Sequence, residues 1–446
     1  MKFKLLFLNK ITAFMILDFS ITNYKSFQDE ATLTMTAETS KLKSSNIHRV
    51  ANNMDELFRT SKVSVIYGPN ASGKSNLLTA LTDFINYIVK QPKLGSPVGI
   101  YNSFSFDLKK MAEPTRYRIN FLGPENIRYQ YSVAVAFSRI IEEDLIYYPE
   151  KRPRKIFKRK SNIQKVEEVN QGTEIEIEEL TVDKKKYSVF SNQLLLSKFG
   201  EEPHDLLSKV YIYFRDTYNL EVCRENYSDT LRDKAAKILL SDNQLKKDLE
   251  RLFIVADTKI FDLDIEEVED KNTINYQGVT RAIRTKTEKK IQLHYGHALY
   301  NNGVRIKEAK VLVPHDNESK GTQTLFTIGT NILNALRKGQ VLIVDELDSS
   351  LHPYITKMLV QLFLSEKINK NGAQLIFNTH DVTLLDEELF RKDQIWLTEK
   401  NDIGVSELFC LSDFDGLRED TPFEKWYMAG KFGGLPKIPN LDKIFS

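Results

Sequence analysis

Residues 63–78, VSVIYGPNASGKSNLL, join two apolar runs through a turn rich in glycine and serine. Positions 68–75 match the pattern G-x-x-x-x-G-K-[S/T], whose glycines let backbone N–H groups point at phosphate oxygens without a Cβ in the way. An expected strand precedes the turn and an expected helix follows, so the helix N-terminus adds partial positive charge. A chance glycine turn is the alternative, but pattern and context together favour a phosphate-binding loop. The residues assigned to this loop are Gly68, Pro69, Asn70, Ala71, Ser72, Gly73, Lys74, Ser75 and Asn76.

Two side chains of the loop have predicted chemical roles. The Lys74 ammonium is expected to reach the β- and γ-phosphates, and the Ser75 hydroxyl is expected to bind Mg²⁺. A second acidic site is then needed, and the stretch VLIVDE, residues 341–346, supplies one. Asp345 is predicted to hold Mg²⁺ through its water shell, and Glu346 to polarise the attacking water. Many buried strands end in acidic residues without such a role, but a phosphate loop in the same chain favours the metal site.

Two further segments lie close to the acidic strand in sequence. His380, in NTHD, is expected at the carboxyl end of a neighbouring strand, where ligands bind in open α/β sheets, and is predicted to sense the γ-phosphate. A lone histidine is normally structural, so its position carries this prediction. The stretch ESKGT begins an expected helix, whose N-terminus suits anions, although an ordinary capped helix start is the alternative. The candidates within it are Ser319, Gly321 and Thr322.

The composition is that of an ordinary globular chain of 446 residues, 41% hydrophobic and 28% charged. The net charge of +2 means that contact with nucleic acid or membrane would need a local patch. Cys223 and Cys410 are too few for a disulfide framework, and no apolar run approaches the roughly 20 residues of a membrane span. A cytoplasmic protein is expected, with residues 1–14 as a dispensable extension or the product of an upstream start codon.

Hydrophobic periodicity predicts three parts. Residues 1–150 form the first part of a nucleotide-binding domain, residues 151–256 a charged hairpin with a helical insertion, and residues 257–446 the second part of the domain. The predicted fold class is α/β: a P-loop nucleotide-binding domain with an antiparallel β-subdomain and an inserted helical lobe. The expected elements of the first part are a hairpin in residues 16–37, a strand at 63–67, a helix after Ser75 and an antiparallel layer in 116–149.

The charged segment has two possible meanings. Residues 151–160, KRPRKIFKRK, carry seven basic side chains, and residues 167–179, EEVNQGTEIEIEE, carry six acidic ones. Because charge runs usually mark exposed faces, a solvated hairpin with compensating charges is favoured over a contact with a phosphate backbone.

Taken in order, the motifs resemble the ABC-class ATPases of the SMC, RecF and OLD type. They are LDFSITNYKSF, GPNASGKS, a long insertion, ESKGT, VLIVDELDSSLHP and NTHD. The resemblance implies an ABC-type fold that binds ATP with Mg²⁺, a signature motif at ESKGT, a D-loop at SSLHP and a switch role for His380. Over residues 15–446 the chain also resembles the stand-alone AAA/ABC ATPases of bacterial abortive-infection loci, the RloA/AbiLi group, in the stretches EPTRYRINFL, DLIYYP and WYMAGKFGGLPKIP. One departure is that neither Gln91 nor Gln130 can be assigned as the glutamine of a Q-loop.

This resemblance implies an ATP hydrolase that acts as the sensor or regulatory ATPase of an anti-phage system, with a separate effector protein such as a Toprim-like nuclease. It also implies a homodimer or higher oligomer in which the Ser319 motif of one protomer completes the ATP site of another. The alternative is a RecF/SMC-like repair ATPase that clamps DNA. A scaffold that binds ATP without hydrolysing it is a third possibility, against which the presence of Glu346 argues. DNA or RNA is a possible partner, and a membrane is not expected.

Overall fold

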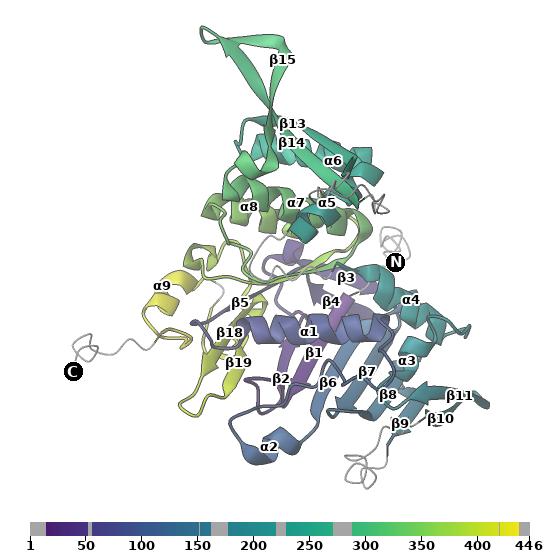
Figure 1. The fold of residues 1–446 in the computed structure, drawn as a ribbon. Coiled ribbons are helices and arrows are strands. Elements are labelled where there is room, and N and C mark those ends of the chain that lie inside the picture. Colours follow the sequence, from purple (N-terminus) through teal and green to yellow (C-terminus); the bar gives the residue numbers. More distant parts are fainter. Residues whose placement is uncertain are drawn as a thin grey trace, which may run out of the picture. The chain divides into compact units, whose positions relative to one another are not determined.

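The computed structural model describes residues 15–51, 56–150, 152–161, 177–219, 229–270, 288–418 and 420–436 (Figure 1). The expectations for residues 1–14, most of the acidic run and Cys223 lie outside these ranges. The chain forms two compact units. The first comprises Met1–Val222, Ala335–Asp348 and Thr356–Ser446, and the second comprises Cys223–Asn334 and Ser349–Ile355. The segment expected at 151–256 is therefore divided between the two units.

The central sheet of the first unit is built around the strand that enters the glycine-rich loop. β5 (Val63–Tyr67) is wholly buried and runs parallel to β17 (Gln374–Asn378) on one side and β18 (Ile395–Lys400) on the other. Burial on both faces explains why these strands read as continuous apolar runs rather than as alternating ones. The spatial order is β12–β16–β17–β5–β18–β19, with β12 at Tyr218–Asn219, β16 at Val341–Val344 and an antiparallel β19 at Ser406–Cys410.

A second, antiparallel sheet of the same unit confirms the expected hairpin and antiparallel layer. Its strands, in spatial order, are β2 (Ala31–Thr34), β1 (Met15–Thr22), β6 (Thr115–Leu122), β7 (Arg128–Val135), β8 (Ile140–Tyr148) and β9 (Arg154–Lys160). Two small hairpins accompany it, β3 (Ile47–Ala51) with β4 (Leu57–Ser61), and β10 (Ile177–Val182) with β11 (Lys185–Phe190).

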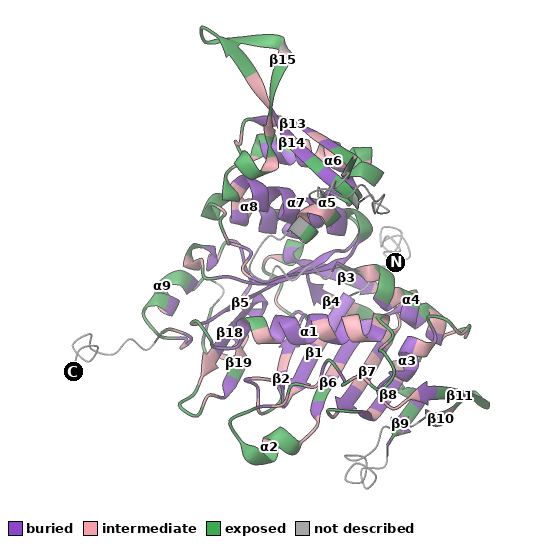
Figure 2. Ribbon diagram, viewed as in Figure 1, coloured by how far each residue is buried: buried purple, intermediate pink, exposed green. Residues whose placement is uncertain are grey.

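Helix α1 (Lys74–Val89) packs between the two sheets, as the leucine spacing after Ser75 predicts. It contacts β16 and β17 of the parallel sheet and β1 of the antiparallel sheet. Figure 2 shows buried residues along α1 and along the strands beside it. Phe84 is fully buried, and its ring stacks on Tyr117 of β6 at 4.9 Å between centroids. The shared core thus fixes the helix that begins at the loop. Other helices of this unit are α2 (Leu108–Ala112), α3 (Leu195–Lys198), α4 (Leu207–Thr217), α9 (Phe423–Met428) and most of α8 (Pro353–Leu364).

The second unit contains two helices packed on a three-stranded sheet, followed by most of a longer helix. Tyr295 is buried at its centre, between the rings of Phe253 and Phe326 at 5.7 and 6.1 Å. None of the helices in the described ranges is long and apolar enough to cross a membrane. The elements are α5 (Asp229–Ser241), α6 (Asn243–Val255), β13 (Ile260–Asp270), β14 (Glu288–Asn301), β15 (Val304–Pro314) and α7 (Lys320–Lys338).

The basic run belongs to the antiparallel sheet as the edge strand β9. Lys158 lies 3.9 Å from the carboxylate of Asp144, and Lys160 lies 4.0 Å from that of Glu142, both on the neighbouring β8. Arg159 points to the opposite face, where it is buried 3.5 Å from Glu143. Part of the compensating charge therefore comes from β8, which precedes the basic run in sequence.

Candidate nucleotide-binding site

The loop between β5 and α1 has the backbone conformation that its glycines predict. Gly68 and Gly73 adopt φ values of 148° and 115°, where side chains other than glycine are strained. Ala71 between them also has a positive φ of 63°. Positive φ values at these three positions turn backbone N–H groups toward one side of the loop, which is an arrangement that binds anions.

Lys74 begins α1 and its side chain folds back under the loop. Only 5% of it is exposed, and its ammonium donates to the carbonyl oxygens of Gly68 at 2.8 Å and Pro69 at 3.0 Å. Burial lowers the pKa of Lys74 to about 8, although the carboxylates of Asp345 and Glu346 favour its charged form. Because the Lys74 ammonium donates to neutral carbonyls, its positive charge can bind an incoming phosphate group.

Ser75 and Asp345 meet in the structure although they are far apart in sequence. The exposed Ser75 hydroxyl donates to Oδ1 of the buried Asp345 carboxylate at 2.9 Å. The contact follows from the sheet order, because β16 delivers Asp345 to the carboxyl edge on which the loop lies. A hydroxyl beside a carboxylate is the oxygen donor set that Mg²⁺ prefers, so the predicted metal residues fit the ion.

Asn378 is a site residue that the sequence analysis did not single out. It ends β17, between the strands that carry Asp345 and the loop, and it is fully buried. Its amide nitrogen donates to Oδ1 of Asp345, and its amide oxygen accepts the Glu346 N–H at 2.5 Å. Glu346 has a φ of 56°, which is uncommon for a residue with a side chain. Asn378 therefore holds both acidic residues; its position two residues before His380 was the available signal.

His380 lies on the exposed turn after β17, close to the loop. Its backbone N–H donates to the Asp348 carboxylate at 3.3 Å. Burial and then the charge of Lys74 lower the pKa of His380 from its ordinary value, so the ring is neutral near pH 7. His380 and the loop share a pocket of about 650 Å³ with the C-terminal segment. The lining residues are Gly68, Pro69, Asn70, His380, Val382, Glu399, Lys400, Tyr427, Met428, Leu435 and Pro436.

The ESKGT stretch belongs to the second unit and caps a helix there. The Ser319 hydroxyl accepts the Thr322 N–H at 3.1 Å and contacts the Thr322 hydroxyl at 2.9 Å. Gly321 lies against SSLHP, because a Cβ on it would come within 2.8 Å of the Ser350 carbonyl oxygen. The two segments that the resemblance assigns as signature motif and D-loop are thus neighbours within one unit.

Neither candidate glutamine is placed for a role at the loop. The Gln91 amide donates to the Ser197 carbonyl at 2.5 Å, beyond the end of α1 and about 24 Å along the helix from Ser75. Gln130 lies in β7 of the antiparallel sheet. The Q-loop stays unassigned.

A buried strand, a glycine-rich loop and a helix, with an acidic strand end beside the loop, define a P-loop nucleotide-binding protein. The predicted α/β fold class is confirmed. Residues 63–386 match the family described as "AAA domain, putative AbiEii toxin, Type IV TA system", and the chain belongs to this family. The match identifies an AAA domain, and the ABC class and the closer RloA/AbiLi assignment stay predictions.

Several solved structures are similar over most of their length. The Smc head domain with a coiled coil and joint from Pyrococcus yayanosii is 10% identical, covers 93% of this chain and 99% of its own, and gives a TM-score of 0.42. The SMC head domain from Thermotoga maritima is 12% identical, with coverages of 89% and 98% and a TM-score of 0.38. The recombination mediator RecF bound to ATP is 13% identical, with coverages of 82% and 92% and a TM-score of 0.32. No curated protein sequence matches the chain.

Proposed function

We propose that the chain binds ATP with Mg²⁺ and hydrolyses it. The observation that carries this proposal is the hydrogen bond of 2.9 Å between Ser75 and Asp345, made beside a buried lysine at the start of α1. Membership of a family of AAA domains supports it. A glycine turn with no ligand would not require a serine and a carboxylate to converge at its mouth.

Each residue of the site then has a role. Lys74 leaves the carbonyls of Gly68 and Pro69 to neutralise β- and γ-phosphate charge, and Ser75 and Asp345 hold Mg²⁺. When bound, Mg²⁺ supplies charge neutralisation on the phosphate oxygens. Glu346 orients and polarises the attacking water, and Asn378 fixes the backbone from which Glu346 projects.

The decisive experiment compares ATP binding by the wild-type chain and by Lys74→Ala. The variant loses the main counter-charge of the phosphates, so ATP affinity should fall below detection while the fold is retained. Equal affinity of a folded Lys74→Ala chain would refute the site assignment. Lys367→Ala is the matched control, because it removes an exposed lysine between α8 and β17 and leaves the loop intact.

For the biological role, we infer a regulatory ATPase of an anti-phage system that acts with a separate effector protein. The family description, which names an AbiEii toxin, and the RloA/AbiLi resemblance support this role. A DNA-clamping repair role gains no support from the basic run, because Lys158 and Lys160 of β9 lie beside carboxylates of β8. Phage challenge of cells carrying the native operon, with wild-type or Lys74→Ala chains, tests the role: protection that survives the substitution would contradict it.

We further propose that two protomers share their ATP sites through Ser319 and Gly321. Ser319→Arg should then block hydrolysis but leave ATP binding within about threefold, because the serine acts on the other protomer's nucleotide. Mixing Ser319→Arg with Lys74→Ala should restore one composite site. A confirmed heterodimer without any hydrolysis would rule out shared sites.

A further inference from the structure

Strand β18 reaches the glycine-rich loop from the side opposite β17. It pairs in parallel with β5, with Ile395 opposite Val65 and Leu397 opposite Tyr67. The next residue, Thr398, is therefore level with Gly68, where the chain leaves the sheet to form the loop.

Thr398 is fully buried and contacts the loop at two points. Its hydroxyl lies 2.5 Å from the hydroxyl of Ser72, and it also lies 3.3 Å from the Tyr67 carbonyl oxygen, to which it can donate. A Cβ on Gly68 would lie 2.4 Å from the Thr398 carbonyl oxygen and 2.5 Å from its hydroxyl. The first glycine of the loop is thus required by Thr398 as well as by its own φ.

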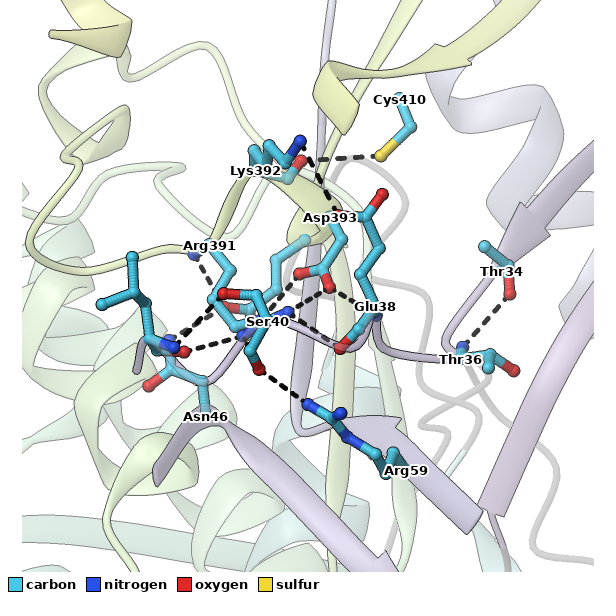
Figure 3. A network of polar contacts seen from close by, with 12 residues as sticks. Thr34, Thr36, Glu38, Ser40, Asn46, Arg59, Arg391, Lys392, Asp393 and Cys410 are labelled. Atoms are coloured by element: carbon cyan, nitrogen blue, oxygen red, sulfur yellow. Dashed lines mark hydrogen bonds and ion pairs between the residues drawn. The ribbon is translucent and has the colours of Figure 1, made fainter. Parts of the chain in front are cut away.

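The start of β18 is fixed by a buried network (Figure 3). Arg391 is fully buried; it donates to the Asp393 carboxylate at 2.8 Å and to the Leu42 carbonyl at 2.7 Å. The same carboxylate accepts the backbone N–H of Glu38 at 2.8 Å. The next residue, Gln394, donates from its side-chain amide to the Val63 carbonyl of β5 at 2.8 Å. A shift of β18 along β5 would therefore break buried hydrogen bonds.

The partner strand β19 supports the second glycine in the same way. The Ser406 N–H donates to the Ser26 carbonyl at 2.7 Å, and a Cβ on Gly73 would lie 2.7 Å from the Ser406 hydroxyl. Residues of the β18–β19 pair therefore lie against both Gly68 and Gly73 of the loop.

We propose that Thr398 is a positioning residue of the nucleotide site, whose hydroxyl holds Ser72 and so fixes the loop in its phosphate-binding conformation before the ligand arrives. This inference rests on the proposed function. A loop already ordered loses less entropy on binding, so removing the hydroxyl should weaken the binding of any nucleotide that carries a β-phosphate. Turnover at saturating ATP should change little, because the loop contacts are shared by the ground and transition states.

The test uses Thr398→Val, which keeps the shape and removes the hydroxyl, and Thr398→Ser, which keeps the hydroxyl. In the valine variant the Kd for ATP and for ADP should both rise about tenfold, since a buried partner loses its hydrogen bond, while kcat stays within about twofold. The serine variant should return both affinities to within about threefold of wild type. The matched control is Thr356→Val in α8, a fully buried threonine whose hydroxyl has no hydrogen-bond partner within the described part of the chain. It should leave both Kd values unchanged.

Two further measurements keep the outcomes separable. Ser72→Ala removes the same bond from the other side, so its effect on Kd should match that of Thr398→Val, and the double variant should be no weaker than either. Valine and wild-type chains with equal Kd, or a serine variant as weak as the valine one, would overturn the role of the hydroxyl. If the wild type itself fails to bind ATP, or Lys74→Ala binds as well as wild type, the proposed function has failed instead.

Discussion

The buried position of Lys74 predicts that nucleotide affinity depends on pH in a range where a solvated lysine stays charged. In the free protein, burial lowers the pKa of this lysine from 10.5 to about 8. Phosphate charge beside the ammonium favours its protonated form, so the pKa of Lys74 rises again when a nucleotide binds. Binding above the lower pKa must therefore be accompanied by proton uptake.

The magnitude follows from the lower pKa. About nine-tenths of the free protein carries the charged lysine at about pH 7 and about one-tenth at about pH 9, so ATP affinity should fall about tenfold across this interval. The free energy of unfolding should instead increase as the pH rises over this interval. The unfolded chain binds more protons than the folded chain between about pH 8 and 10.5, so this lysine makes folding more favourable as the pH rises. Opposite trends distinguish the effect from general alkaline unfolding.

Titration calorimetry at about pH 9, in buffers of different ionisation enthalpy, should show uptake of about 0.9 proton per ATP bound. Lys74→Arg is the control, because its guanidinium stays protonated throughout and shares every other titration, including those of ATP. In the free protein, burial and then the charge of Lys74 lower the pKa of His380, away from this interval. If wild type and Lys74→Arg lose affinity in parallel between pH 7 and 9, the lysine is not buried in the way that the structure describes.

Three further outcomes are expected. Glu346→Gln should lower ATP turnover at least about 100-fold, measured by phosphate release, while ATP affinity stays within about threefold, because only the water-polarising carboxylate is lost; near-normal turnover would remove Glu346 from this role. Arg159→Met should destabilise the chain by about 3–5 kcal/mol in urea unfolding, because it leaves Glu143 buried without its cation; a change below about 1 kcal/mol would contradict this pairing. Replacing Lys158 and Lys160 by glutamine should leave both nucleic-acid affinity and its salt dependence unchanged, since both lie beside carboxylates of β8; a shallower salt slope with weaker binding would show that these lysines contact phosphates.

The residues proposed to contact a nucleotide can be predicted from sequence because ligand chemistry restricts both their types and their spacing. The glycines at 68 and 73 and Lys74 lie within one short motif, and their geometry follows from local backbone rules. Predicting that Asp345 lies beside the loop required one additional step, the expectation that neighbouring parallel strands end at a common edge of the sheet. The contact between Ser75 and Asp345, which are 270 residues apart, agrees with that step.

The residues that hold the ligand-binding groups could not be predicted in the same way. Thr398 acts on Ser72 across 326 residues, and this contact exists only because β18 is placed next to β5. The strand-like pattern of QIWLTEK predicts a strand but contains no information about its neighbour. The charge run shows the same limit: its acidic neighbours in sequence suggested the pairing, whereas sheet order placed Lys158 and Lys160 beside β8.

The sheet order also explains which strand positions which residues of the candidate site. β5 ends in the loop and has one parallel neighbour on each side. On one side β17 ends in Asn378, which holds Asp345 and the backbone of Glu346, the residues proposed to bind the metal and to activate water. On the other side β18 carries Thr398, which holds Ser72 and lies against Gly68, in the loop proposed to bind the phosphates. Because the two supports contact different groups on opposite sides of β5, a substitution in one should leave the hydrogen bonds of the other intact.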